Sequence, residues 1–410
     1  MTDEILLASL IVVLLVVGLT LGLLFARQRL VPQAALTVTV NGTREISAQR
    51  SDRLLGVLHG AGIGIPAGCG GSGTCGLCRV IVEGEGAGEA GATERGILSA
   101  AERKAGKRLA CQTQLRGPCS VTVPEDFLSG GGGFDCTVVS NRMMAPLIRE
   151  LVLDLPAGHA FNFRAGGFMQ LTAPAYELDF AGMPVDPAFR EAWHMARWDT
   201  LKGEAARPVT RAYSIASRPE DTAAGRVVFN IRLAVPPAGR EEEIAPGQVS
   251  SWLFARQPGD VVQVSGPFGE IHVQDTGAEM VFIGGGVGMA PLRAMIHEQI
   301  AAGTGRKMRY FYGARSVADL FYVKEFDGIA AAHPNFSWMP ALSDPAPGDR
   351  WTGATGFIHD SVRRAMAGHP APEDCEYYLC GPPVMISAVL ATLERLGVEP
   401  GNIFKDDFGG

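Results

Sequence analysis

The sequence predicts a multidomain protein with an N-terminal transmembrane helix, a small α+β domain, an antiparallel β-barrel and an α/β domain built on a parallel sheet. Three observations lead to this fold class. The chain has 410 residues, which is too long for one ordinary domain. Residues 5–26 contain no charged side chain, and four consecutive glycines at 130–133 separate two segments with different sequence patterns. We expect domains at 1–30, 31–130, 131–275 and 276–410.

The segment 5–26, ILLASLIVVLLVVGLTLGLLFA, is the transmembrane candidate. At 1.5 Å per residue it extends roughly 33 Å, which is enough to cross the hydrocarbon core of a bilayer. A cleaved signal peptide is the alternative, but Asp3 and Glu4 precede the apolar run and no A-x-A site follows it. Arg27 and Arg29 follow the run, so the positive-inside rule places the rest of the chain in the cytoplasm.

Residues 31–130 alternate between apolar and polar side chains in short segments. The stretches LTVTVNG, CRVIVEG and CSVTVPE have the period of strands, whereas DRLLGVLHGAGI has helical spacing. The pair Asn41-Gly42 is typical of a hairpin turn. These patterns predict a small β-rich domain crossed by one helix.

Four of the eight cysteines, Cys69, Cys75, Cys78 and Cys111, follow the spacing C-x5-C-x2-C-x32-C. In a reducing cytoplasm this spacing favours metal or redox chemistry over disulfides. Zinc is the alternative, but zinc ribbons usually pair two C-x2-C knuckles, and this stretch has one. Three ligands on one glycine-rich loop and a fourth far downstream are typical of a [2Fe–2S] cluster. The loop resembles that of vertebrate-type ferredoxins, which implies a β-grasp fold.

The remaining candidate ligands show no such pattern. Cys119, Cys136 and Cys375 have no partner spacing, and we expect each to be a small buried side chain. The eight histidines form no metal-spaced cluster in the sequence, and we assign none of them a role.

Residues 131–275 consist of short alternating segments separated by Pro and Gly, which is typical of a small antiparallel barrel. Residues 176–206 interrupt the pattern with a long connection that contains two tryptophans. A connection of this length is either a functional, partner-facing loop or a surface excursion packed on itself. The sequence leaves both interpretations open.

From residue 276 strand patterns alternate with helix patterns, which predicts a parallel sheet. The strand 280–283 leads into Gly284, Gly286 and Gly288, and we expect a helix from Pro291. Glycines at this point let a pyrophosphate approach the backbone, and the start of the helix supplies N–H donors. Taken alone, the motif is also compatible with a tight turn.

Three motifs occur in the order RAYS at 211–214, GGGVGMAP at 284–291 and CGPP at 380–383. Together they resemble the ferredoxin–NAD(P)H reductase superfamily, which implies an FAD-binding barrel followed by a pyridine-nucleotide domain. The resemblance implies that Arg211 clamps the flavin pyrophosphate, that Tyr213 packs against the isoalloxazine and that Ser214 hydrogen-bonds near its N5.

Further residues take their expected roles from the same resemblance. Gly247, Val249 and Ser250 resemble the family's second phosphate-binding loop. Cys380 would lie beside the transferred hydride, so we expect Cys380, Ser214 and Tyr213 to form the catalytic group. Phe408 in the KDDFGG tail would cover the flavin until nicotinamide displaces it.

The choice of nicotinamide is less clear from the residues. Arg315 and Ser316 follow the second strand and could bind a 2′-phosphate, and no acidic ribose partner is evident there. The family most similar to this chain uses NADH. The resemblance therefore implies NADH, while the residues alone leave NADPH open.

These parts form one relay, because a nicotinamide gives up a hydride, a [2Fe–2S] cluster takes one electron at a time, and FAD connects the two. With the predicted anchor, the tryptophan-containing insertion and the DDFGG end, the chain resembles the F subunits of sodium-translocating NADH:quinone reductases. This resemblance implies an NADH-oxidising oxidoreductase, single-pass in the bacterial inner membrane, with residues 5–26 in the bilayer and membrane subunits of the same respiratory complex as partners.

Two alternatives share the same motifs. One is a membrane-tethered reductase component of an oxygenase or hydroxylase, and the other is an anchored ferredoxin-type electron carrier. The formal net charge of −7 offers no basic domain for a phosphate backbone, so we expect no nucleic-acid partner.

Overall fold

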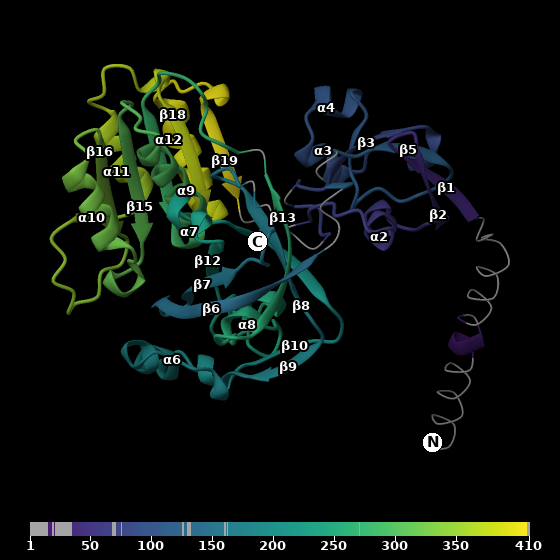
Figure 1. Cartoon of the computed structure of the whole chain (residues 1–410), viewed down its shortest axis with the longest axis horizontal. Coiled ribbons are helices and arrows are strands. Elements are labelled where there is room, and N and C mark those ends of the chain that lie inside the picture. The colour runs from purple at the N-terminus through teal and green to yellow at the C-terminus, as the bar shows by residue number, and fades with distance from the viewer. Residues whose placement is uncertain are drawn as a thin grey trace, which may run out of the picture. The chain divides into compact units, whose positions relative to one another are not determined.

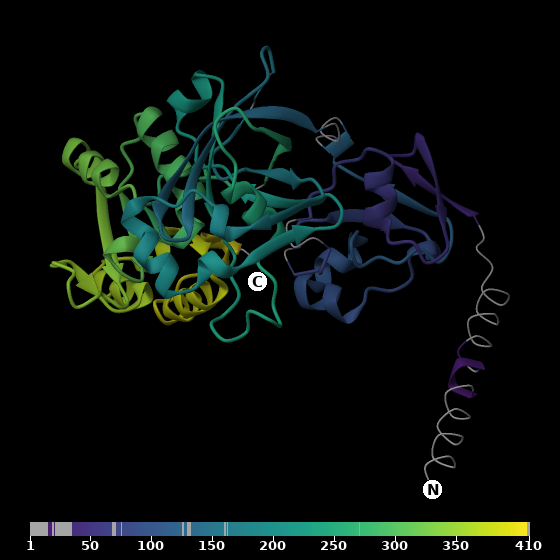
Figure 2. The same cartoon turned by 90° about the horizontal axis from the view of Figure 1, so that it is seen from below.

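The computed structural model describes residues 15–18, 20, 35–67, 71–74, 76–124, 127–128, 133–159, 161, 163–269 and 271–407. The chain divides into two compact units: unit 1 comprises residues 1–61 and 79–124, and unit 2 comprises residues 62–78 and 125–410. The strands of unit 1, coloured purple to blue, and those of unit 2 form separate sheets (Figures 1 and 2). Among the described residues no helix is long and apolar enough to cross a membrane. The predicted span 5–26 lies largely outside them.

Unit 1 contains a mixed five-stranded sheet in the order β2-β1-β5-β3-β4. Its strands are β1 (Ala35–Val40), β2 (Arg44–Gln49), β3 (Arg79–Glu83), β4 (Lys107–Leu109) and β5 (Cys119–Thr122). Strand β1 is antiparallel to β2 and parallel to β5. The helix α2 (Leu54–Gly60) buries Leu54, Leu55 and Leu58. This architecture agrees with the predicted β-grasp fold.

The predicted hairpin turn joins β1 and β2. Asn41 and Gly42 have φ values of 48° and 69°, and two successive positive φ values define the type I′ turn that Asn-Gly favours. The structure also contains the short helices η1 (Glu85–Ala87), α3 (Ala92–Ile97) and α4 (Ala100–Lys104), so more than one helix accompanies the sheet.

A buried ion pair holds the segment between β3 and α3. Arg108 donates to both carboxylate oxygens of Glu94, at 2.9 and 2.8 Å, and to the carbonyls of Ala87 and Gly88. Burial by itself raises the pKa of Glu94, but hydrogen bonds from Arg108 and from the backbone N–H groups of Gly91 and Leu109 lower it below its ordinary value. Glu94 is therefore held as an anion inside unit 1.

Unit 2 begins its main body with a six-stranded antiparallel sheet in the order β11-β8-β13-β6-β7-β12. The strands are β6 (Phe134–Ala145), β7 (Ile148–Asp154), β8 (Phe168–Ala173), β11 (Val209–Ser214), β12 (Arg226–Arg232) and β13 (Val261–Phe268). A bridge from Ile215 to Phe229 brings the chain after β11 back to β12, which closes the predicted barrel. The helices α7 (Pro219–Ala223) and α8 (Gln248–Phe254) accompany it.

The insertion predicted at 176–206 packs on this barrel. It forms the hairpin β9 (Tyr176–Asp179) and β10 (Lys202–Ala205), with α6 (Arg190–Met195) and the turns η2 (Phe180–Gly182), η3 (Pro187–Phe189) and η4 (Trp198–Thr200) between the strands. Trp193 is buried, donates its indole N–H to the Pro146 carbonyl at 2.7 Å and stacks on Phe254 of α8. The inner side of the insertion is therefore part of the core.

The last part of unit 2 is the predicted parallel sheet, in the order β17-β16-β15-β14-β18-β19. Its strands are β14 (Met280–Gly285), β15 (Met308–Ala314), β16 (Phe336–Leu342), β17 (Ala354–Thr355), β18 (Glu376–Gly381) and β19 (Ile403–Asp407). Helices α9 (Met289–Ala301) and α10 (Val323–Ala332) share one apolar cluster, and α11 (Ile358–Met366) and α12 (Pro383–Arg395) share another. Successive residues of β14 alternate between these clusters, so helices cover both faces.

The strand order reverses between β14 and β18. The chain runs from β14 outward through β15, β16 and β17, and then returns to place β18 on the other side of β14. In open α/β sheets, ligands bind at the carboxyl ends of the strands at such a reversal. The glycine turn after β14 and the CGPP motif at the end of β18 both lie at this edge.

Candidate active site

Three strands of unit 2 bring a serine, a cysteine and an aspartate together. Ser214 ends β11, is 6% exposed and donates from its Oγ to Oδ2 of Asp406 at 3.3 Å. Asp406 lies on β19, in register with Cys380 on β18, and Cys380 is 1% exposed. Cys380 and Asp406 also line one small cavity together with Tyr378 and Phe404. The barrel and the parallel sheet therefore meet at these side chains.

The other residues of the RAYS strand are half-buried. Burial raises the pKa of Tyr213 well above its ordinary value, so its phenol keeps its proton. Arg211 donates to the Thr210 carbonyl at 2.9 Å, and β8 supports the strand through the pair Arg211–Leu171. The strand is thus fixed by its pairing with β8, and the Tyr213 side chain stays uncharged.

The turn after β14 requires glycine at different positions for different physical reasons. A Cβ on Gly288 would lie 1.9 Å from the Cys380 carbonyl oxygen, and one on Gly284 would lie 2.9 Å from the Leu292 side chain. Both glycines are needed for protein packing. Gly286 has φ +56°, and a Cβ added to it would meet no heavy atom within 4 Å, so this glycine leaves the backbone open to a phosphate.

The helix after this turn begins earlier than expected. The turn η5 (Gly286–Gly288) leads into α9 at Met289, and Pro291 is the third residue of α9 instead of its first. Proline is tolerated here because the first-turn N–H groups have no acceptor within the helix. The expectation that the helix starts at Pro291 was therefore wrong by two residues.

The second expected phosphate loop lies at the start of α8. Gly247 precedes the helix, and Val249 and Ser250 are buried in its first turn. The Ser250 hydroxyl donates to the Gly247 carbonyl at 3.1 Å and accepts from the N–H of Ala234 at 3.2 Å. In this structure the hydroxyl therefore fixes the start of α8.

A buried ionic network joins the barrel to the parallel sheet. Arg293 of α9 donates to the carbonyl of Ala216, two residues beyond Ser214, at 2.6 Å. It also donates to both carboxylate oxygens of Glu325, at 2.6 and 2.9 Å, and its guanidinium lies 4.3 Å from the ring centroid of Tyr322. The network therefore fixes the segment after Ser214 relative to the nucleotide turn.

Acidic side chains already engage the two residues that could bind a 2′-phosphate. Arg315 forms an exposed ion pair with Asp344 at 3.1 Å, and the Ser316 hydroxyl donates to Asp319 at 2.9 Å. The acidic groups that were not evident in the sequence thus lie at the end of β15. A negative phosphate would have to compete with both carboxylates.

The described part of the cysteine loop has the backbone that a cluster cradle requires. Gly71, Gly73 and Gly76 have φ values of 94°, 87° and 67°, which only glycine adopts readily. Cys78 directly precedes β3, Cys111 follows β4 by two residues, and each is 1% exposed. Cys69 and Cys75 lie outside the described residues. The glycine angles and the buried Cys78 thiol of the loop, and separately the buried Cys111 thiol of unit 1, are each of the kind that an iron–sulfur cluster requires.

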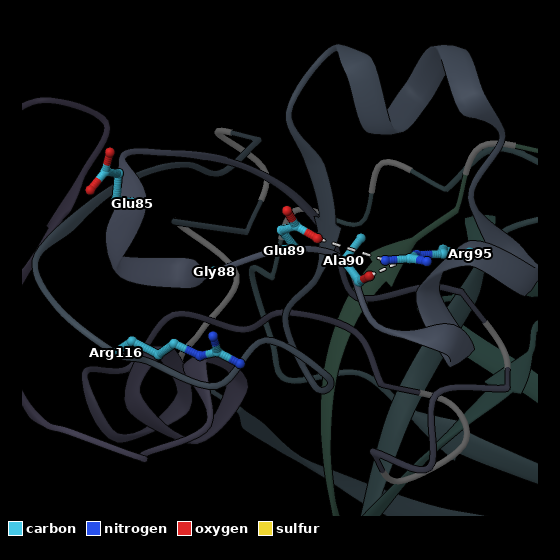
Figure 3. Close-up of a pocket in the computed structure, with 6 residues that line it drawn as sticks. All are labelled: Glu85, Gly88, Glu89, Ala90, Arg95 and Arg116. Carbon is cyan, nitrogen blue, oxygen red and sulfur yellow. Dashed lines mark hydrogen bonds and ion pairs between the residues drawn. The ribbon is translucent and has the colours of Figure 1, made fainter.

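Unit 1 has an open surface pocket, and none of its lining residues is a cysteine (Figure 3). Its lining residues are Glu85, Gly88, Glu89, Ala90, Arg95 and Arg116. Arg95 already donates to the Ala90 carbonyl at 3.0 Å and lies 3.9 Å from Glu89 (Figure 3). We assign this pocket no chemistry.

Sequence reasoning missed Asp406. The KDDFGG tail drew attention only for Phe408, which lies outside the described residues. The doubled aspartate in this tail was the available signal, but only the pairing of β18 with β19 places its first carboxylate beside Cys380 and Ser214. The three remaining cysteines, Cys119, Cys136 and Cys375, are buried as expected.

A flavin-type barrel, a nucleotide-type parallel sheet and a β-grasp unit in one chain define an iron–sulfur flavoprotein reductase of pyridine nucleotides. Family models agree with this class. The 2Fe-2S iron-sulfur cluster binding domain matches residues 38–116, the oxidoreductase FAD-binding domain matches 198–273 and the oxidoreductase NAD-binding domain matches 282–390.

Relatives over the full length identify the family. The F subunits of the Na(+)-translocating NADH-quinone reductases of Neisseria meningitidis and Methylococcus capsulatus are each 44% identical over 409 residues, covering 99% of this chain and 100% of theirs. A crystal structure of an Amycolatopsis cytochrome P450 reductase is similar with a TM-score of 0.61 and 27% identity, covering 91% of this chain and 98% of that one. The chain belongs to the family formed by the F subunits of Na(+)-translocating NADH-quinone reductases.

Proposed function

We propose that this chain is the NADH-oxidising subunit of a sodium-translocating NADH:quinone reductase. It takes electrons from NADH through FAD to its [2Fe–2S] cluster and passes them to membrane subunits of the same complex. The relatives at 44% identity carry that name, and the three family domains supply the three redox sites. The observation that carries the proposal is the meeting of Ser214, Cys380 and Asp406 where the barrel joins the nucleotide sheet.

FAD, when bound, accepts a hydride from NADH and releases the two electrons singly, which the cluster requires. The residues that would hold it are Arg211, Tyr213 and Ser214 on β11, with Gly247 and Val249 at the start of α8. Gly286 would receive the pyrophosphate of the nucleotide at its open turn. Cys380 would line one side of the space for the nicotinamide, because β18 ends there at the binding edge of the sheet.

Ser214 and Asp406 have a specific task in this scheme. A hydride carries one proton with two electrons, so one proton must leave when both electrons pass to the cluster. The Ser214 hydroxyl already donates to the Asp406 carboxylate, which makes the pair a path for a proton from the buried junction. The carboxylate accepts the proton and passes it to solvent.

The preference for NADH is supported by charge. Asp344 and Asp319 engage Arg315 and Ser316 at the end of β15, where a 2′-phosphate of NADPH would place additional negative charge. An unphosphorylated ribose meets no such repulsion and can hydrogen-bond to a carboxylate.

We further propose that residues 5–26 form a single transmembrane helix, which anchors the chain in the bacterial inner membrane with its redox domains in the cytoplasm. The uncharged run is long enough to span the hydrocarbon core, and Arg27 and Arg29 mark its cytoplasmic end. An anchor of this kind would keep the cluster close to the membrane subunits that receive its electrons.

The test is anaerobic rapid mixing of the cofactor-loaded chain with NADH, followed by flavin absorbance and by electron paramagnetic resonance of the cluster. We expect flavin bleaching followed by the signal of a reduced [2Fe–2S] cluster. Absence of bleaching would overturn the assignment. A membrane-tethered oxygenase reductase would give the same spectra, so copurification of the anchored chain with membrane subunits that reduce quinone must accompany them.

Asp406→Asn tests the proton path. We expect flavin reduction by NADH to persist and cluster reduction to slow by roughly 100-fold or more, the usual size of a general acid–base contribution. Asp327→Asn, the same substitution at an exposed position of α10, is the control and should leave both steps unchanged. Equal rates in wild type and Asp406→Asn would remove Asp406 from the path.

A further inference from the structure

A cysteine, a histidine and a glutamate gather at the end of the parallel sheet that the nucleotide site does not use. Glu279 directly precedes β14, Cys375 directly precedes β18, and His369 follows α11 by three residues. Strands β14 and β18 are parallel neighbours with Met280 opposite Glu376, so the two residues before them lie at the same amino-terminal edge. The glycine turn and Cys380 lie at the carboxyl ends of the same two strands.

The three side chains are close enough to share one ion. Nε2 of His369 lies 3.2 Å from Oε2 of Glu279, and Sγ of Cys375 lies 4.0 Å from each ring nitrogen of His369. One ligand atom from each residue lies within 4.8 Å of the other two. The side chains of His369 and Glu279 are 10% and 12% exposed, which gives an ion a way in, whereas Cys375 is buried.

These separations are near those of a tetrahedral zinc site. With Zn–N and Zn–O near 2.0–2.1 Å and Zn–S near 2.3 Å, tetrahedral geometry puts nitrogen and oxygen ligands about 3.3 Å apart and sulfur about 3.6 Å from either. The His369–Glu279 distance already matches, whereas the thiol must approach by up to about 1.2 Å and the His369 ring must turn its Nε2 towards the thiol, which now lies equally far from both ring nitrogens. We propose that Glu279, His369 and Cys375 form a Zn²⁺-binding site.

The ligand types and the surrounding charges favour this ion. Thiolate and imidazole ligands suit zinc, whereas Mg²⁺ and Ca²⁺ take oxygen ligands. Glu279 and the thiolate supply two negative charges for zinc, while Arg309, which pairs with Glu279, and Asp374 lie nearby with opposite charges. Arg309 bonds the Oε1 atom of Glu279, which leaves Oε2 directed at His369.

The His369 ring must change its bonding when the ion binds. Zinc replaces the proton that Nε2 shares with Glu279, and the ring proton then lies on Nδ1. The N–H of Ala371, which approaches Nδ1 at 3.3 Å, must move away. With three protein ligands, the fourth position is left for water.

The site ties together the starts of the two strands that carry the reactive edge. Zinc bound there would stabilise the parallel sheet by binding the folded chain in preference to the unfolded one. Because the ligands lie at the opposite ends of β14 and β18 from Gly286 and Cys380, the NADH-to-FAD step does not require the ion. The ion would therefore act on the stability of the sheet and not on hydride transfer.

The test uses the full-length protein with flavin and cluster loaded, dialysed against buffered free Zn²⁺. We expect one zinc per chain, with one sulfur near 2.3 Å and nitrogen or oxygen ligands near 2.0–2.1 Å by zinc X-ray absorption. His369→Gln and Cys375→Ser should each lose the ion, and the control Cys119→Ser, a buried cysteine of unit 1, should retain it. The proposal would be overturned if no zinc is bound or if both site variants bind zinc as well as the wild type. It would also be overturned by a shell of four sulfurs, which indicates zinc at the cluster cysteines.

A second readout separates binding from a folding defect. Zinc at 100 times its dissociation constant should raise the folded-to-unfolded ratio of the wild type about 100-fold, seen as a higher unfolding midpoint, and should leave the midpoints of the site variants unchanged. An unchanged wild-type midpoint would contradict the proposal. If neither variant folds, the number of sulfur ligands around zinc in the wild type decides between the proposed site, which has one, and the cluster cysteines, which have four.

Discussion

Replacing Glu325 with Gln leaves the buried guanidinium of Arg293 without its counter-charge. Burial raises the pKa of Glu325, but hydrogen bonds from His297 and Arg293 outweigh burial and hold the pKa at about 2, against an ordinary value of 4.5. At 1.36 kcal/mol per pKa unit, this difference corresponds to about 3 kcal/mol of folding stability. The side chain is only 21% exposed, so solvent screening removes little of it. Breaking a buried pair costs about 3–5 kcal/mol, which agrees.

The assay is urea unfolding of the flavin-loaded protein at neutral pH, followed by flavin fluorescence. Because the pKa is lowered in the folded state, the stabilisation is fully present above pH 4.5 and is lost as the pH falls towards 2. The difference between wild type and Glu325→Gln should therefore shrink in acid. The control is Glu243→Gln, whose partner Arg240 is exposed, and it should lose at most about 1 kcal/mol. Equal losses in the two variants would refute the reasoning.

Three further predictions concern other parts of the chain. Cys75→Ala should remove the cluster's electron paramagnetic resonance signal while NADH still bleaches the flavin, and loss of bleaching would contradict separate redox sites. Cys380→Ala should retain FAD but slow flavin reduction by roughly tenfold or more, measured by stopped flow, because the nicotinamide loses a side-chain contact that orients it. Glu94→Gln leaves Arg108 unpaired and should lower the stability of unit 1 by about 3 kcal/mol, measured from the unfolding of cluster absorbance. An unchanged midpoint would show that the pair is dispensable.

Local patterns in the sequence were sufficient for most of the fold. Strand alternation, the Asn41-Gly42 turn and the change to strand–helix alternation near residue 276 are all short-range signals, and the structure has the corresponding sheets. The sequence patterns predicted only one helix in residues 31–130 and missed α3 and α4, because these helices are only six and five residues long. Such short helices leave too few turns for a clear period.

The residues that sequence reasoning missed are those brought together by long-range pairing. Ser214 and Asp406 are 192 residues apart, and no spacing rule links them. Glu279 and His369 are 90 residues apart, and their proximity depends on the parallel pairing of β14 and β18. For the insertion at 176–206, the burial of Trp193 shows that its inner side packs on the barrel, which amphipathic spacing alone could not decide.

The glycines in the turn after β14 differ in what each could be exchanged for. Gly288 faces the Cys380 carbonyl so closely that any Cβ would push the backbone of β18 out of place, and the Cys380 sulfur would move with it. Gly286 has a left-handed φ but open surroundings, so Asn or Asp fits there at modest strain. In a library of all single substitutions, active clones should hold glycine alone at 288 and several residues at 286. A motif written as identical letters therefore contains positions with very different mutational tolerance.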